Sequence, residues 1–183
     1  MKKTIIIIAA ALLTGSISRG NAQTFTLKSK DIGGQATEQQ VFNGFGCKGG
    51  NLSPELSWTH APEGTKSFAV TMYDPDAPTG SGWWHWLIFD IPANATELKQ
   101  NAGNIDQAIA PAGAVQSITD FGKAGYGGPC PPEGHGFHQY IITVYALKTD
   151  KLGLDKNANP AMVGYYLNSN TLQKASLVMY YKR

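Results

Sequence analysis

Three short stretches of the sequence combine proton-carrying side chains with residues that stiffen the backbone. The first is Tyr73-Asp74-Pro75-Asp76-Ala77-Pro78. A proline follows each aspartate, directly or after one residue, and proline fixes its own φ angle and restricts the residue before it. The stretch is therefore expected to present two carboxylates from a stiff turn. The alternative is an ordinary turn held by Asx hydrogen bonds.

The second stretch is Trp83-Trp84-His85-Trp86, which enters an apolar segment. If this segment forms a hairpin with the strand before Asp74, His85 comes close to that carboxylate. A neighbouring carboxylate favours the protonated ring, and indole side chains would desolvate the pair. The alternative is a core histidine packed between tryptophans.

The third stretch is rich in glycine and proline, runs from Gly122 to Tyr140, and contains His135 and His138. Glycines allow backbone N–H groups to face a small anion, and prolines stiffen the rim of such a site. The stretch has neither the lysine nor the following helix of a nucleotide-binding P-loop, so a nucleotide-hydrolysing site is disfavoured. His135 and the distant His60 are interpreted as loop residues.

Strongly apolar segments must position these three stretches. Runs rich in β-branched and aromatic residues predict strands at residues 67–73, 84–91, 139–147 and 175–181, and an alternating run predicts an edge strand at 24–29. The segment at 139–147 has apolar residues on both faces, as in a packed sheet of a sandwich. Helical spacing after Pro160 predicts a helix ending near residues 168–170, and a weaker pattern predicts one at 92–100. Residues 101–132 are expected to form a long loop that carries function.

The first 22 residues are typical of a secretory signal peptide. Lys2 and Lys3 precede a nine-residue apolar run that is too short to cross a bilayer, and Gly20 and Ala22 suit signal peptidase. The predicted organisation is therefore a signal peptide at 1–22, a single domain at 23–183, no transmembrane segment, and a periplasmic or secreted location.

The predicted mature chain is nearly neutral. Removing the signal peptide leaves twelve basic and thirteen acidic side chains, a net charge of −1. The remaining lysines are scattered and Arg183 is the one arginine left. Because nucleic-acid binding needs a basic face, this composition excludes a nucleic-acid-binding protein.

The sequence contains two cysteines, Cys47 and Cys130. An even number of cysteines in an exported chain predicts a disulfide, which would close a loop of 83 residues and fix the rim of the glycine-proline stretch. The alternatives are two free thiols, or a bond that forms and breaks under redox control.

Taken together, these stretches resemble the phosphatidylethanolamine-binding protein family, also called the Raf kinase inhibitor protein family, and especially its secreted bacterial branch. The matching residues are Asp74-Pro75-Asp76-Ala77-Pro78, His85-Trp86, Ile91-Pro92, Gly128, Pro131-Pro132, Gly134, Gly136, His138 and Tyr140. The run from Asn51 to Trp58 also looks like the family element Ser-Pro-x-Leu-x-Trp. The resemblance covers most of the mature chain in the right order.

The resemblance implies an antiparallel β-sandwich with a few short helices, one of them near the C-terminus. It implies a pocket for phosphate or a phosphoryl headgroup, lined by Asp74, His85, Pro132, His138 and Tyr140. Supporting roles are expected for Asp76, Trp86, Gly128, Gly134 and Gln139. Gln139 stands where many family members carry arginine, which makes the outer pocket less basic.

A phosphate monoester in such a pocket would accept hydrogen bonds from His85, His138, the Tyr140 hydroxyl and the glycine-loop amides. A bare carboxylate would repel the anion. The repulsion is avoided if Asp74 is protonated, or if it lies behind His85 and holds that ring as a cationic donor, and we expect the second arrangement.

The resemblance implies binding rather than turnover, with no cofactor and no metal ion. The partner is expected to be a small phosphoryl-containing anion, with modulation of a kinase, a protease or another signalling protein as a further role. The alternative is an inhibitor that acts through its surface while the pocket is vestigial. A hydrolase is the least favoured reading, because no nucleophile lies near a histidine in a known arrangement. A metal site from Asp74, His85 and His138 has no supporting spacing.

Overall fold

The computed structural model describes residues 23–183, so the predicted signal peptide lies outside the described residues. Its elements are β1 (Thr26–Lys28), β2 (Asn43–Gly44), β3 (Cys47–Lys48), β4 (Leu56–Thr59), β5 (Ser67–Asp74), β6 (Trp83–Pro92), β7 (Glu97–Leu98), β8 (Val115–Gln116), β9 (His138–Leu147), α1 (Pro160–Asn170) and β10 (Thr171–Tyr181). No helix within this range is long and apolar enough to span a membrane.

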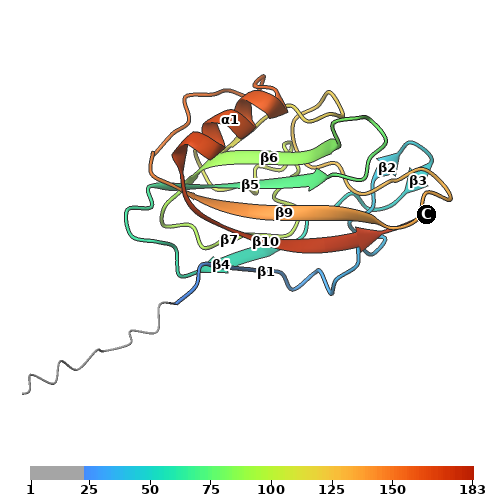
Figure 1. Ribbon diagram of the computed structural model, residues 1–183, viewed down its shortest axis with the longest axis horizontal. Coiled ribbons are helices and arrows are strands. Elements are labelled where there is room, and N and C mark those ends of the chain that lie inside the picture. The colour runs from blue at the N-terminus through green and yellow to red at the C-terminus, as the bar shows by residue number, and fades with distance from the viewer. Residues whose placement is uncertain (1–22) are drawn as a thin grey trace, which may run out of the picture.

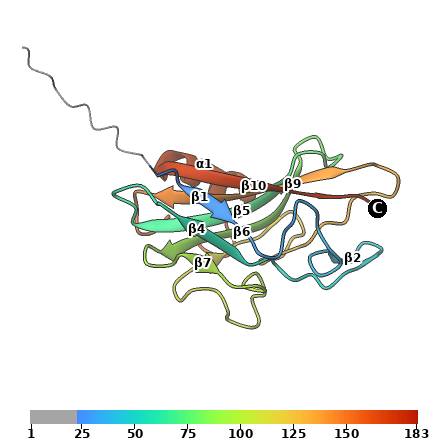
Figure 2. The ribbon, with the colours of Figure 1, turned by 90° about the horizontal axis from the view of Figure 1, so that it is seen from below.

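Two antiparallel sheets form the body of the molecule (Figure 1). The larger sheet has the strand order β10-β9-β5-β6-β8, and the smaller has the order β1-β4-β7. The view from below looks onto the small sheet, with α1 on the far side (Figure 2). A short hairpin of β2 and β3 lies at one end of the sandwich. The predicted β-sandwich is confirmed.

The alternation of side chains along the strands explains why both faces of the large sheet are covered. Phe68, Val70 and Met72 face the core between the sheets, whereas Ala69 faces a second core under α1. In β9, every second residue from Tyr140 to Ala146 faces the core between the sheets. A period of two places such residues on one face of a strand, so two apolar faces require two covering layers.

One helix prediction is confirmed and the other is wrong. α1 begins after Asn159, whose side chain accepts a hydrogen bond from the Met162 amide, with proline at the first helical position. Residues 92–100 do not form a helix. Pro92 ends β6, a turn follows, and the carbonyl of Thr96 accepts a hydrogen bond from the Trp58 amide, so the small sheet captures this segment as β7.

The predicted loop at residues 101–132 contains only the two-residue strand β8. Cys130 in this loop forms a disulfide with Cys47 in β3, with a Cα–Cα distance of 6.1 Å. The predicted disulfide is therefore present. It joins the glycine-proline stretch to the β2–β3 hairpin at the end of the sandwich where His138 begins β9.

Candidate functional site

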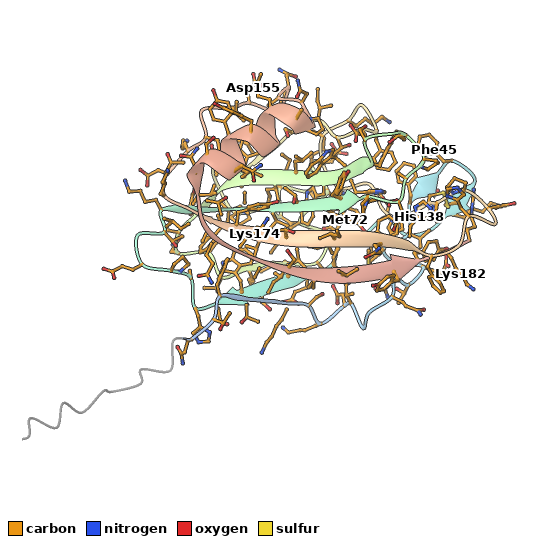
Figure 3. All side chains as sticks on the ribbon, viewed as in Figure 1. Phe45, Met72, His138, Asp155, Lys174 and Lys182 are labelled. Atoms are coloured by element: carbon orange, nitrogen blue, oxygen red, sulfur yellow. A yellow bond between two sulfur atoms is a disulfide. The ribbon has the colours of Figure 1, made fainter. Side chains whose placement is uncertain are left out.

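A pocket of about 180 Å³ opens at this end of the sandwich. Its wall comes from four parts of the chain: the β2–β3 hairpin, the segment from the end of β5 to the start of β6, the long loop, and the start of β9. The lining residues are Phe45, Asp74, Ala77, Pro78, Thr79, Trp83, His85, Phe121, Cys130, Pro131, Pro132, His138 and Tyr140. Figure 3 shows Phe45 and His138 at the same end of the molecule. The structure thus brings together all five side chains predicted to line a pocket.

Asp74 pairs with His138, not with His85 as the sequence suggested. Its Oδ2 atom lies 2.8 Å from His138 Nδ1, and both side chains are buried. The reason is topological: β5 pairs with β9, so the end of β5 faces the start of β9. The carboxylate accepts the Nδ1 proton of His138 and fixes the orientation of that ring.

His85 occupies a β-bulge in β6. Met72 pairs with Trp86 and Tyr73 with Trp84, which leaves His85 as the extra residue between them. A bulge of this kind turns a side chain away from the regular alternation, and bulges are frequent beside functional sites. The bulge points His85 into the pocket wall, where its ring packs edge-on against Tyr140.

His85 is a neutral ring, so the expectation of a cationic donor is wrong. Its Nδ1 atom lies 2.7 Å from the carbonyl oxygen of Gly127, which can only accept a hydrogen bond. Burial lowers the pKa of His85 to about 4. The backbone hydrogen bond to Gly127, the charge of Asp74 and a backbone hydrogen bond to Gly128 oppose this shift only in part. At neutral pH His85 therefore carries its single ring proton on Nδ1 and a lone pair on Nε2.

Tyr140 contributes a hydroxyl that has no hydrogen-bond partner among the described residues, although the side chain is fully buried. Burial raises the pKa of this phenol above its ordinary value, and the nearby Asp74 carboxylate acts in the same direction. The hydroxyl thus keeps its proton and remains a donor without an acceptor. Buried polar groups without partners are rare and are expected where a ligand supplies the partner.

His135 is a site residue that sequence reasoning missed. Its Nδ1 atom lies 2.9 Å from His138 Nε2, so both ring nitrogens of His138 have partners. His135 is exposed, between Gly134 and Gly136, which both have positive φ angles. The spacing of three residues in Gly134-His135-Gly136-Phe137-His138 was visible in the sequence, but only the turn that reverses the chain brings the two rings together.

The predicted supporting residues lie outside the pocket wall. The Asp76 side chain accepts a hydrogen bond from the backbone amide of Gln139 at 2.8 Å and thereby connects the turn after β5 to β9. The Trp86 indole donates to Gln116 in the core. Gly134 donates its amide to the Arg183 carbonyl.

The amides of Gly127 and Gly128 are not free to bind an anion. The Gly127 amide donates to the His85 carbonyl, and the Gly128 amide donates to the Asn51 side chain. Gly128 packs so closely on residues 40–42 that an added Cβ would lie 1.9 Å from the Gln40 carbonyl oxygen. These two glycines therefore allow close packing beneath the pocket, and the expectation that glycine-loop amides face the ligand is wrong for them.

The pocket wall contains no lysine or arginine. Within residues 23–183 no group of three or more potential metal ligands is present. The polar groups that the wall can offer to a small molecule are therefore the Tyr140 hydroxyl, the ring of His85 and, where His135 leaves its Nε2 atom, the ring of His138. Such a set can hold one small polar or anionic group by hydrogen bonds.

A second and larger cavity of about 720 Å³ lies beside the pocket. The two cavities share Phe45 and Phe121 as wall residues. These rings stack at 5.8 Å, and the Phe45 side chain is 68% exposed. The backbone of Phe45 adopts a positive φ of 52°, and Arg183 donates a hydrogen bond to its carbonyl. An aromatic partition thus separates the two cavities.

Comparisons with known proteins agree with this architecture. The family model for phosphatidylethanolamine-binding proteins matches residues 33–182. The UPF0098 protein YbcL of Escherichia coli is 50% identical over 184 residues, covering 100% of this chain and 99% of that protein. The UPF0098 protein YbhB of the same organism is 48% identical over 153 residues, covering 82% and 96%.

Solved structures agree as well. The crystal structure of Escherichia coli YbcL, described as a new member of the mammalian PEBP family, matches with a TM-score of 0.85 at 53% identity. The match covers 87% of this chain and 98% of that one. A homologue from Chlamydia trachomatis has the same fold, with a TM-score of 0.71 at 24% identity over 87% and 97% of the two chains. The chain described here belongs to the phosphatidylethanolamine-binding protein family.

Proposed function

We propose that the pocket binds a phosphoryl group without transforming it. The observation that carries this proposal is that the unpartnered Tyr140 hydroxyl and the buried Asp74–His138 pair share the wall of one open pocket. A tetrahedral anion with several acceptor oxygens can satisfy donors that converge from different directions.

His138 is the proposed source of positive charge. Because its Nδ1 proton is committed to Asp74, the ring can donate from Nε2 only when both nitrogens are protonated. The Asp74 carboxylate balances that charge, so it assists anion binding through His138 and does not need to touch the ligand. The ligand then meets an imidazolium, the Tyr140 hydroxyl and the ring of His85.

The wall residues support binding without turnover. The Thr79 hydroxyl donates to the Gly82 carbonyl, and Cys130 is held in the disulfide. A nucleophile for covalent catalysis needs a base within hydrogen-bond reach, and neither side chain has one.

We further propose that the protein works outside the cytoplasm, in the periplasm or as a secreted protein. The support is the disulfide between Cys47 and Cys130 together with the apolar segment at residues 5–13. Structural disulfides persist in oxidising compartments. There the pocket would take small phosphoryl-containing compounds or headgroups, and occupancy of the pocket would be the signal for any partner protein.

Replacing Asp74 by asparagine is expected to weaken phosphate binding by about 10- to 100-fold at pH 6, the range expected for a lost charge-assisted hydrogen bond. Asparagine preserves the shape of the side chain but no longer stabilises the imidazolium of His138. Isothermal titration of the mature protein with inorganic phosphate measures the effect.

Asp76→Asn is the matched control, because it removes a carboxylate only two residues from Asp74. That carboxylate accepts a hydrogen bond from the backbone amide of Gln139 and does not line the pocket. Its phosphate affinity should stay within about twofold of the wild-type value. Equal binding by wild type and Asp74→Asn at every pH would contradict the role of the Asp74–His138 pair. Absence of phosphate binding by the wild-type protein would contradict the proposed function.

Replacing His135 by alanine is expected to tighten phosphate binding about fivefold, which corresponds to one hydrogen bond of ordinary net strength. His135 is hydrogen-bonded to His138 Nε2, the atom that is proposed to bind the ligand, so the ligand must displace His135. The surrounding turn borders open space at Gly134 and Gly136, which leaves room for that movement. Titration with phosphate measures the change, with the exposed His60→Ala as the control. Weaker binding would show instead that His135 contacts the ligand.

A further inference from the structure

The hydrogen bond between His85 and Gly127 determines what kind of anion the pocket can accept. Since the Gly127 carbonyl has no hydrogen to give, the 2.7 Å contact requires the proton of the ring on Nδ1. The other ring nitrogen, Nε2, then carries a lone pair and can only accept. His85 is 4% exposed and lines the pocket, so a molecule bound there is the partner that this lone pair can take.

The surroundings of His85 keep the ring neutral. Aromatic rings pack edge-on against it, Phe121 at 5.3 Å and Tyr140 at 5.1 Å between ring centroids. The titratable side chains that face it are Asp74 from β5 and His138 and Tyr140 from β9. Asp74 is already hydrogen-bonded to His138 at 2.8 Å. Burial lowers the pKa of His85 to about 4, so the ring remains an acceptor over the physiological range.

We infer that the pocket selects anions that carry an acidic proton, namely hydrogen phosphate and singly protonated phosphate monoesters, and that it discriminates against fully deprotonated oxyanions such as sulfate. This inference rests on the proposed function and specifies its ligand. The P–OH group donates to His85 Nε2, while the other phosphoryl oxygens accept from the Tyr140 hydroxyl and from His138. Each of the three side chains then has a complementary partner.

Sulfate is the informative comparison because it has the same tetrahedral shape and carries no proton near neutral pH. In the pocket, one of its oxygens would face the lone pair of His85, and no hydrogen bond could form there. A site whose buried acceptor is left unpaired by one ligand and paired by another discriminates strongly between the two. The expected preference for phosphate over sulfate is about 10- to 100-fold.

Isothermal titration at pH 6 with inorganic phosphate and with sulfate tests the inference on the oxidised mature protein. We expect His85→Ala to weaken phosphate binding and to leave sulfate binding unchanged, so that the ratio of the two affinities approaches one. His85→Gln should retain the preference, because its amide can donate to Gly127 and present an acceptor oxygen to the pocket. The exposed His60→Ala is the control and should behave as the wild type. Thermal unfolding of each variant confirms the fold.

The outcomes separate this inference from the proposed function. Phosphate and sulfate binding of equal strength to the wild type would overturn the inference and leave the proposed anion pocket standing. An equal loss of both anions in His85→Ala would also overturn it, since His85 would then serve only the shape of the pocket. Absence of binding by both anions would overturn the inference and the proposed function together.

Discussion

Replacing Cys47 and Cys130 by serine is expected to lower the free energy of unfolding by about 4 kcal/mol. The disulfide joins positions separated by 83 residues, and in the chain-entropy model a cross-link of that span strongly restricts the unfolded chain. For a domain of this size the loss corresponds to a fall in Tm of roughly 8–16 °C. Urea denaturation and thermal unfolding of the oxidised and double-serine proteins measure both quantities.

The disulfide prediction has an internal control. Wild-type protein treated with a thiol reductant should unfold like the double-serine variant, because both lack the same cross-link. Phosphate binding should also weaken in both proteins, since Cys130 lines the pocket and the disulfide ties its loop to the hairpin that carries Phe45. A change in unfolding free energy below about 1 kcal/mol would contradict the argument from chain entropy.

The body of the fold was readable from the sequence because its signals are local. β5, β6, β9 and β10 each contain a long run of β-branched and aromatic residues, and the two apolar faces of β9 required a layer on each side. The helix after Pro160 carried its own cap. The helix prediction at 92–100 is wrong because this segment pairs with β4, a contact between distant parts of the chain. Such a contact overrides a weak local preference for helix.

The members of the pocket were predictable, but their pairing was not. The sequence places His85 eleven positions after Asp74 across a hairpin, which favours a contact between them. The structure instead places Asp74 against His138, because β5 lies between β6 and β9 and its last side chain points toward β9. Which of the two neighbouring strands a side chain of a central strand contacts depends on the pairing register, and the register is determined by the whole sheet.

The bulge at His85 is the second feature that the sequence concealed. Strict alternation would put Trp84 and Trp86 on the same face of β6, yet Trp86 packs in the core between the sheets and Trp84 against the core beneath α1. The extra residue between them is His85. One extra residue in β6 thus places a buried histidine ring, which can accept a hydrogen bond, at the pocket. The local amino-acid composition does not indicate this bulge.

His85 is also expected to make the fold sensitive to acid. Its ordinary pKa of 6.5 applies in the unfolded chain, whereas burial lowers it to about 4 in the folded protein. Above pH 6.5 the ring is neutral in both states, so the free energy of unfolding does not depend on it. Between pH 6.5 and 4 the unfolded state binds a proton that the folded state does not. Stability therefore falls as the pH falls, by about 3 kcal/mol in total.

Comparison of wild type with His85→Gln isolates this contribution, because both proteins share every other titrating group. Urea denaturation at pH 7 and pH 4.5 should show that wild type loses about 2 to 3 kcal/mol more than the variant between these conditions. His60→Gln, at an exposed position, should lose as much as the wild type. Equal losses in wild type and His85→Gln would mean that His85 takes up its proton in the folded state. A protonated His85 could no longer accept the acid proton of a phosphoryl ligand, so the same measurement bears on the ligand selectivity inferred above.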